Sequence, residues 1–322
     1  MFQSKFLKEI QSQLPGNTSL IDAIATALDI SYDAAHRRTS LKSKLSIDEC
    51  IILAKHYHIA LDSLFETTEK SFISVEKTKH IHNEKELEDY FKTSYDSLLP
   101  LLQQQASRIL YSAKDIPLFY TIGDDILSRF KTYVWLKLLD NSFNTKTFEQ
   151  FSPGVGLIEA AKNLKGLYQN LNTIEIWDIT TVNSTLKQIH FYNQAGQISN
   201  SIAIELCEAL KVLMKTISDR VDVNASHYQM YYNELLLMNN NVLVSTPNQQ
   251  SLYVPFSILS YYLTSDTITC QQAEAYLNQQ LQHSKLLNTS GEKEKRTFFN
   301  RINAKIDALK QLIEATQVLD FE

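Results

Sequence analysis

The stretch from Ser19 to Phe65 constrains the fold of this chain more than any other, because it encodes several short helices with tight turns between them. Ser19 and Asp22 have the spacing of a capping box, so a first helix is expected to begin after Ser19. Apolar residues then recur at the spacing of one buried helical face: Leu20, Ile24, Ala25 and Leu28. A turn, Asp29-Ile30-Ser31, follows, in which Ser31 can cap the next helix. We therefore expect two helices joined by a tight turn.

The second of these helices, from Tyr32 to about Arg38, combines a small inward side chain with a polar outer face. Ala35 is expected to face inward, and the small side chain of Ala25 lets this helix cross the first one closely. No acid occurs from Ala34 through Ile47, whereas four cations do: Arg37, Arg38, Lys42 and Lys44. The sequence therefore predicts a basic surface made by this helix and the loop after it.

Further helices complete a small bundle on either side of this pair. Residues 2–14 form one helix, which ends at Pro15-Gly16-Asn17. Ser46 and Glu49 form a second capping box, which opens a helix over 47–57. The expected inner face of that helix is Ile47, Ile51, Ala54 and Tyr57. The segment 60–65 closes the bundle, which is large enough to fold alone.

Residues 1–66 resemble the helix-turn-helix domain of lambda-repressor-like (XRE-type) transcriptional regulators. The resemblance includes the later pattern Leu45-Ser46-Ile47-Asp48-Glu49, then Leu53-Ala54 and the segment 59–65. It implies that the second helix of the pair enters the major groove of DNA and reads base edges. Carried over by position, it implies a DNA-binding surface made of Ser31, Tyr32, Asp33, His36, Arg37, Arg38, Lys42 and Lys44. The chain has Asp29 where the family usually has glycine and Arg38 at an apolar position, so Leu41 is expected to fill the core there. The alternative is a helical bundle whose basic loop is only solvated.

The composition fits a two-domain globular protein. The chain has 322 residues, 44% of them hydrophobic, and seven glycines and six prolines, which favours long helices. Its net charge of −5 excludes a generally basic nucleic-acid-coating protein, so a contact with DNA requires a local patch. Three distant cysteines favour a reducing compartment over a disulfide framework. With no signal peptide or membrane segment in the sequence, we expect a cytoplasmic protein that does not bind membranes.

A polar segment, 67–83, is expected to be a linker, with a short strand over Phe72–Val75. It contains His80 and His82, which are more typical of exposed linker residues than of a metal site. Asn83 then caps a helix predicted over 84–111, whose apolar positions form a heptad-like seam from Leu87 to Ile109. That seam can pair with a second copy of the chain or pack on its own domain.

The rest of the chain predicts a larger mixed α/β domain, so the fold class is α+β, with an all-α bundle first. Strands are expected at 116–121, 174–178, 228–238, 242–245 and 251–256, the last three of which are expected to form an antiparallel meander. Helices are expected at 124–139, 155–171, 181–193, 198–219, 257–263, 271–283 and 291–316. Thr121 with Asp124 is expected to cap the first of these helices. The last helix carries an apolar seam from Phe298 to Ile313.

No catalytic motif emerges from the sequence. Gly154-Val155-Gly156 has Glu159 at the third glycine position of a nucleotide loop, so we discard that interpretation. Glu234, among the tyrosines of 228–238, could bind a cationic or hydroxylated ligand or be an ordinary edge residue. We therefore expect no enzyme activity, no cofactor and no metal.

These observations predict a DNA-binding transcriptional regulator whose domain over 84–322 senses an effector or mediates dimerisation. Expected partners are double-stranded operator DNA, a second copy of the chain and an unidentified small-molecule or peptide effector. The final helix is the first choice for the dimer interface and the helix 84–111 the second. Two alternatives stay open: an enzyme or ligand-binding protein with a DNA-binding appendage, and a peptide-sensing regulator with helical repeats.

Overall fold

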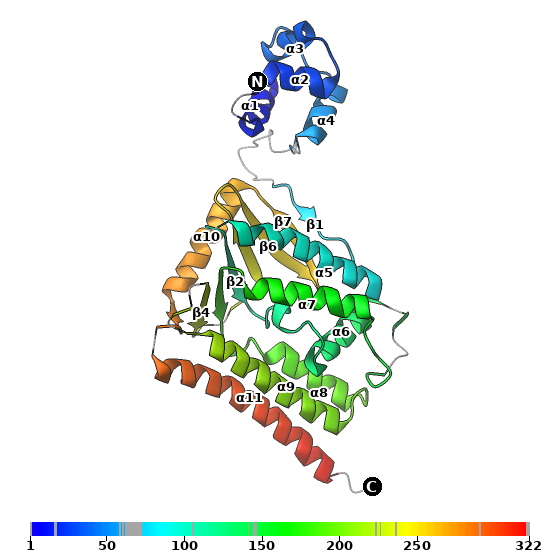
Figure 1. Cartoon of the computed structure of the whole chain (residues 1–322), viewed down its shortest axis with the longest axis vertical. Helices are drawn as coiled ribbons and strands as arrows, with labels where there is room; N and C mark the ends of the chain where they lie inside the picture. The colour runs from blue at the N-terminus through cyan, green and yellow to red at the C-terminus, as the bar shows by residue number, and fades with distance from the viewer. Residues whose placement is uncertain are drawn as a thin grey trace. The chain divides into compact units, whose positions relative to one another are not determined.

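The computed structural model of the chain divides into two compact units, residues 1–75 and 76–322 (Figure 1). The boundary between them lies inside the segment that the sequence predicts as a linker. The structure describes residues 2–15, 18–57, 59, 61, 73–104, 106–140, 142–143, 147–222, 224–225, 227–235, 237–289 and 291–319. The first unit is helical and the second combines helices with a mixed sheet, so the α+β prediction is confirmed. Among the described residues, no helix has both the length and the apolar composition that a membrane crossing requires.

In the described part of the first unit, four α-helices surround one small core. These helices are α1 (Phe2–Gln13), α2 (Leu20–Leu28), α3 (Tyr32–Thr39) and α4 (Ile47–His56). Its core consists of the buried side chains Phe6, Leu7, Ile10, Ile24, Ala35, Leu53 and Ile59. The predicted helical segment 60–65 falls outside the described residues except for Leu61.

The buried face of α4 differs from the predicted one. Ile47 is 79% exposed and Ile51 is 40% exposed, whereas Leu53 is fully buried. Of the predicted face, only Ala54 and Tyr57 pack against the core, together with Cys50. The face of α4 that carries Leu53 packs against the core, and the face that carries Ile47 lies in solvent. The prediction that Ile47 and Ile51 belong to the inner face was therefore wrong.

The second unit is built on one eight-stranded sheet with the order β1-β7-β6-β5-β2-β3-β4-β8. The central strands β2, β3 and β4 are parallel, and every other pairing is antiparallel. The strands are β1 (Glu76–Lys77), β2 (Arg108–Ala113), β3 (Thr173–Trp177), β4 (Tyr228–Asn233), β5 (Asn241–Ser245), β6 (Gln250–Ser257), β7 (Ser260–Thr264) and β8 (Ser284–Leu286). Of the meander predicted over 228–238, 242–245 and 251–256, only the antiparallel pairing of β5 with β6 is confirmed, because β4 pairs with β3 and β8 instead. Strand β7 extends the antiparallel part of the sheet and replaces the helix predicted over 257–263.

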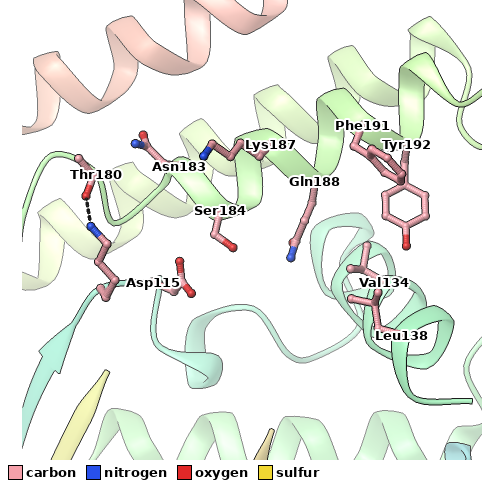
Figure 2. Close-up of a pocket in the computed structure, with 11 residues that line it drawn as sticks. Asp115, Val134, Leu138, Thr180, Asn183, Ser184, Lys187, Gln188, Phe191 and Tyr192 are labelled. Carbon is pink, nitrogen blue, oxygen red and sulfur yellow. Dashed lines mark hydrogen bonds between the residues drawn. The ribbon is translucent and has the colours of Figure 1, made fainter. Parts of the chain in front are cut away.

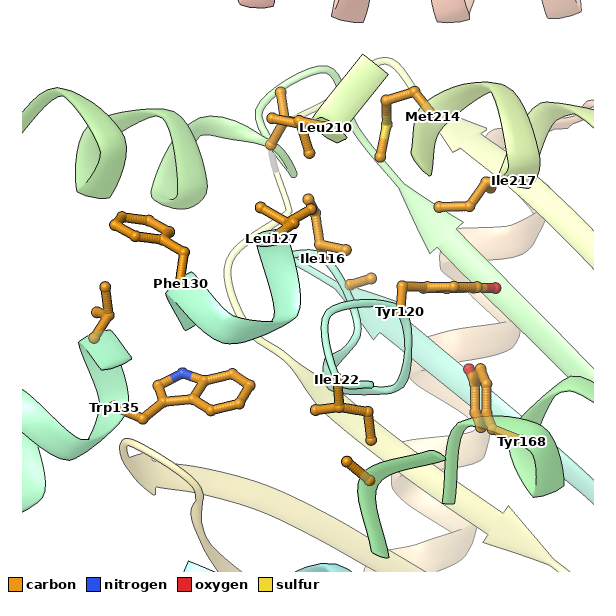
Figure 3. Packing of buried hydrophobic residues seen from close by; sticks show 14 of the residues in the cluster. Ile116, Tyr120, Ile122, Leu127, Phe130, Trp135, Tyr168, Leu210, Met214 and Ile217 are labelled. Atoms are coloured by element: carbon orange, nitrogen blue, oxygen red, sulfur yellow. The ribbon is translucent and has the colours of Figure 1, made fainter. Parts of the chain in front are cut away.

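Helices cover both faces of this sheet. They are α5 (Glu84–Leu98), α6 (Ile126–Leu139), α7 (Val155–Gln169), α8 (Asn183–Gln194), α9 (Asn200–Arg220), α10 (Thr267–Gln282) and α11 (Glu292–Leu319). Strand residues alternate between the faces, so Ile109 and Tyr111 of β2 join the core under most of the helices while Leu110 joins the smaller core under α10. Figure 3 shows part of the larger core, where Leu210, Met214 and Ile217 of α9 face Leu127 and Phe130 of α6.

The predicted helix over 84–111 is shorter in the structure. Asn83 caps α5 as expected, its side chain accepting a hydrogen bond from the Glu86 N–H (2.9 Å). However, α5 ends at Leu98, a 3-10 helix η2 (Leu99–Gln103) follows, and β2 begins at Arg108. Pro100 lies at the start of η2, and a proline cannot donate the backbone hydrogen bond that a continuing helix needs.

Three smaller predictions also require correction. The strand expected over 116–121 is a 3-10 helix, η3 (Leu118–Tyr120). Asp125, rather than Thr121 with Asp124, caps α6 by accepting a hydrogen bond from the Ser128 N–H (2.8 Å). The expected capping bond of Ser19 is absent, since the Ser19 side chain makes no cap hydrogen bond with α2.

Both helical seams that the sequence offers for dimerisation are buried inside the second unit. Leu87 and Phe91 of α5 are fully buried, and α5 packs beside α7 (Figure 1). In α11, Phe298, Ile302 and Ile306 are also fully buried, and this helix packs against α9. These seam residues are covered within the second unit and offer no apolar surface to a second copy, and the choice of dimer interface stays a prediction.

Candidate nucleic-acid interface and candidate ligand pocket

The turn between α2 and α3 sets the direction in which α3 leaves the bundle. Asp29 adopts the left-handed conformation (φ 52°, ψ 50°), which Asp tolerates better than most residues. The Ile30 N–H returns to the Ala25 carbonyl (3.1 Å), and the Ile30 side chain packs against the core. Ser31 then caps α3 by accepting a hydrogen bond from the Ala34 N–H (3.4 Å), as predicted. The geometry of this turn is thus fixed by local hydrogen bonds and one apolar contact.

Most of the predicted DNA-binding side chains lie together on the exposed side of α3 and its loop. Ala35 is fully buried and fixes the inner face of this short helix. The exposed members of the predicted set are Ser31, Tyr32, Asp33, His36, Arg37, Lys42 and Lys44. We call these seven residues the α3 surface.

Arg38 does not belong to this surface. Its guanidinium donates to Glu49 Oε1 from Nε (2.8 Å) and from Nη2 (2.5 Å), and to the Ala34 carbonyl (3.1 Å). The Arg38 side chain is only 21% exposed. The hydrogen bond and charge of Arg38 lower the pKa of Glu49 and thereby favour its ionised form. Arg38 therefore joins α3 to α4, and its prediction as a DNA-binding residue requires correction.

The basic loop is attached to α1 through Gln3, a residue that no sequence pattern marked as functional. The Gln3 amide donates to the carbonyls of Arg38 (3.0 Å) and Ser43 (2.9 Å), and its oxygen accepts from the Leu45 N–H (3.2 Å). These bonds fix the backbone that carries Lys42 and Lys44. Leu41 is 45% exposed with φ 61°, so it does not fill the core as predicted.

The charge of the first unit is local rather than general. Residues 1–75 contain eight Lys and Arg against nine Asp and Glu. Arg38 is paired with Glu49, so the cations of the α3 surface are Arg37, Lys42 and Lys44, for which no ion pair is found among the described residues. A non-specific attraction to polyanions would thus be weak outside this surface.

In the second unit, a pocket of about 610 Å³ opens at the carboxyl ends of β2 and β3. This is where ligands commonly bind in sheets with parallel strands, and the volume suits a small molecule. Its walls come from the segments after the two strands and from facing sides of α6 and α8 (Figure 2). The lining residues are Lys114, Asp115, Val134, Leu138, Thr180, Asn183, Ser184, Lys187, Gln188, Phe191 and Tyr192. No sequence motif marked this site, because its residues come from four separate segments.

A hydrogen-bonded network holds the polar end of the pocket. Lys114 Nζ donates to Thr180 Oγ1 (2.9 Å), and Lys305 of α11 donates to Asn183 Oδ1 (3.0 Å). Lys131 of α6 donates across to Gln188 Oε1 (2.7 Å), and burial lowers the pKa of this lysine to about 8. Asn183 and Ser184 are the first residues of α8, whose N-cap residue, Val182, offers no capping side chain.

The carboxylate among tyrosines that the sequence suggested at Glu234 is found at Glu175 instead. Glu234 lies beyond the end of β4, is exposed and pairs with Lys285 (2.9 Å). Glu175 is fully buried, and its two oxygens accept hydrogen bonds from Tyr120 (2.8 Å), Tyr168 (2.7 Å), Trp177 (2.8 Å) and Tyr228 (3.0 Å). Burial raises the pKa of Glu175, and these donors oppose the shift. With both oxygens engaged, this carboxylate has a role in the core rather than in binding a ligand.

The other candidate motifs also have structural roles. The Gly154 N–H donates to Glu84 Oε1 (2.5 Å), and a Cβ on Gly156 would lie 2.8 Å from the Glu88 carboxylate, the end of a flexible side chain, so this segment joins the start of α7 to α5. The rings of His80 and His82 stack at 4.5 Å. In the part of the chain that the structure describes, no three His, Cys, Asp or Glu side chains are placed to share a metal ion.

Comparison of the chain with protein-family models, with curated proteins and with solved structures gave no match. The functional argument therefore rests on the geometry and chemistry of the α3 surface and the pocket.

Proposed function

We propose that this chain is a sequence-specific DNA-binding transcriptional regulator that acts in the cytoplasm and reads DNA through α3. The observation that carries the proposal is the exposed polar face of α3, which follows a tightly fixed turn and is continuous with an acid-free basic loop. A helix presented in this way fits the major groove, with the residues at its N-terminus nearest the base edges.

The residues of the α3 surface have side chains suited to two kinds of contact. Arg37 can donate two hydrogen bonds to a guanine edge, and Asp33 can accept one from cytosine. Lys42 and Lys44, on the loop, are suited to phosphate contacts, which strengthen binding without reading sequence. Because Gln3 fixes the loop backbone, these lysines are held in a defined place relative to α3.

We further propose that the regulator acts as a homodimer. One helix reads only a few base pairs, whereas two copies place their helices about 34 Å apart, one turn of the duplex. Since the seams of α5 and α11 are buried, the contact must use other surfaces. The second unit is proposed to sense a ligand or to mediate dimerisation. Its eight-stranded sheet gives no support to the alternative of helical peptide-binding repeats.

The second candidate function is protein binding by the first unit. It is favoured by the exposure of Leu41, Ile47 and Ile51, which lie in the loop and on α4 next to the α3 surface. Exposed apolar groups of this kind are typical of interaction sites between proteins. DNA binding predicts a dependence on Arg37 and Lys42, whereas protein binding predicts a dependence on Ile47 and Ile51.

Selection of duplexes from a random-sequence pool by the intact chain tests the proposal. We expect an enriched motif with two related half-sites whose centres are about 10 base pairs apart. The same selection with Arg37→Ala should lose or relax one position of each half-site, while Lys55→Ala, a charge-matched control on α4, should recover the wild-type motif. Failure of the wild-type chain to enrich any motif would refute the proposal, and an enriched single half-site would refute the dimer alone.

A further inference from the structure

The pocket between α6 and α8 has two chemically different ends. Figure 2 shows Asp115, Thr180, Asn183 and Lys187 at one end and Val134, Leu138, Phe191 and Tyr192 at the other. The spacing of Asn183, Lys187 and Phe191 along α8 is i, i+4, i+8, so a single face of this helix runs from the polar end to the apolar end. A ligand that fills the pocket must therefore be polar at one end and apolar at the other.

The polar end favours negative charge. Lys114 and Lys187 line it, and Lys305 approaches it through Asn183. Lys187 is exposed and forms an ion pair with no residue in the described part of the chain, so its charge is available to a ligand. The N-terminus of α8 adds a partial positive charge, because the helix begins at Asn183 without a side-chain cap.

Two acids near these cations, Asp178 and Asp115, reduce the positive charge of the polar end. Asp178 lies 4.0 Å from Lys114 Nζ, but it is almost fully buried and accepts hydrogen bonds from Thr180 and from the Leu237 N–H (2.8 Å). Asp115 is the only acid among the lining residues. The polar end thus keeps a positive balance, with Asp115 as a repulsive element against an anion.

The apolar end combines two exposed side chains with two buried ones. Phe191 is 64% exposed and Leu138 is 57% exposed, whereas Val134 and Tyr192 behind them are buried. An alkyl or aryl group lying between α6 and α8 would remove Phe191 and Leu138 from water, which favours binding.

We propose that this pocket binds a small organic anion, a carboxylate or a phosphate monoester with an apolar group of medium size. The anionic group lies at the N-terminus of α8 between Lys114 and Lys187, and the apolar group lies against Phe191 and Leu138. The inference concerns ligand binding by the second unit and does not depend on the proposed contact with DNA.

Calorimetric titration of the intact chain with octanoate and with octyl phosphate tests this inference and distinguishes the two anionic groups. We expect saturable binding of at least one of them at one site per chain, and at least tenfold weaker binding of octyltrimethylammonium, octyl glucoside and inorganic phosphate. Lys187→Met retains the aliphatic stem of the lysine and should weaken binding about tenfold. Leu138→Ala should weaken binding of both octyl ligands, since it removes part of the apolar wall.

Two further variants separate a local electrostatic effect from a general change of charge. Asp115→Asn should strengthen the binding of the same ligand, because it removes the repulsive acid. Lys215→Met changes the net charge by the same amount as Lys187→Met on an exposed part of α9, and it should leave binding unchanged. Absence of saturable binding by the wild-type chain, equal binding of octyltrimethylammonium, or an unchanged affinity in Lys187→Met would overturn the inference.

Discussion

Replacing Glu175 by leucine is expected to destabilise the second unit much more than replacing it by glutamine. The carboxylate accepts four hydrogen bonds in a fully buried place, from three tyrosine hydroxyls and the Trp177 indole. In Glu175→Gln, the amide oxygen can face Trp177, which can only donate, while the amide N–H groups face tyrosine hydroxyls, which can rotate and accept. A leucine side chain offers none of these groups a partner.

The structure allows the difference between the two variants to be estimated. In the leucine variant, all four donors lose this acceptor, although the Tyr120 hydroxyl still accepts a hydrogen bond from Arg220 Nη1 (2.9 Å). The Trp177 N–H and the Tyr168 hydroxyl make no other hydrogen bond among the described residues, so at least these two donors are left unsatisfied. An unsatisfied buried polar group costs about 1–3 kcal/mol, so Glu175→Leu should be less stable than Glu175→Gln by about 2–6 kcal/mol.

Urea unfolding followed by tryptophan fluorescence measures this difference, because Trp177 and Trp135 both lie in the second unit. The matched controls are Glu234→Leu and Glu234→Gln, at an exposed carboxylate that pairs with Lys285. These two variants should differ in stability by less than about 0.5 kcal/mol. A leucine variant at position 175 as stable as the glutamine variant would show that the four hydrogen bonds do not stabilise the core.

Three further predictions follow from particular contacts. Arg38 lowers the pKa of Glu49 below its ordinary value of 4.5, so the unfolded state binds more protons than the folded state near that pH. Urea unfolding should therefore show that the wild type is more stable than Arg38→Ala, with the full difference above pH 4.5. The difference should shrink as the pH falls through the lowered pKa of Glu49. Ile306→Ala should cost about 2–5 kcal/mol, because Ile306 is fully buried in the second unit; a change in oligomer mass without loss of stability would contradict this. The Gln3 side chain accepts a hydrogen bond from the Leu45 N–H, so Gln3→Ala should speed amide hydrogen exchange at Leu45 and leave exchange in α2 unchanged.

The parts of the fold that the sequence predicted well depend on local interactions. The Ser31 cap and the Ser46–Glu49 capping box need only residues within three positions of each other, and both are present. The helix predicted over 155–171 is present as α7, in which Leu157, Ala161 and Leu164 are buried at the spacing of one helical face. Such signals do not depend on how distant segments pack.

The parts that the sequence did not predict depend on tertiary contacts. The apolar pattern of α5 continues through Leu102 to Ile109, so its spacing concealed the change from helix to strand after Pro100. The spacing of the α11 seam shows an apolar face but not that α9 covers it. Likewise, the ion pair between Arg38 and Glu49 joins residues 11 positions apart, and the pocket assembles residues from four segments. Residue order alone does not determine which partner such groups find.

Titration of the intact chain against a labelled duplex from the selected pool, and against a scrambled duplex of equal length, tests the central claim most directly. Between about 50 and 200 mM salt, the wild type should prefer the selected duplex, and its affinity should fall steadily on both. Arg37→Ala should lose about 1–3 kcal/mol on the selected duplex and little on the scrambled one. Lys42→Ala should weaken both alike and reduce the salt slope by about one, while Lys55→Ala should match the wild type. Equal affinity of the wild type for both duplexes, or unchanged binding in Arg37→Ala and Lys42→Ala together, would contradict DNA recognition by the α3 surface.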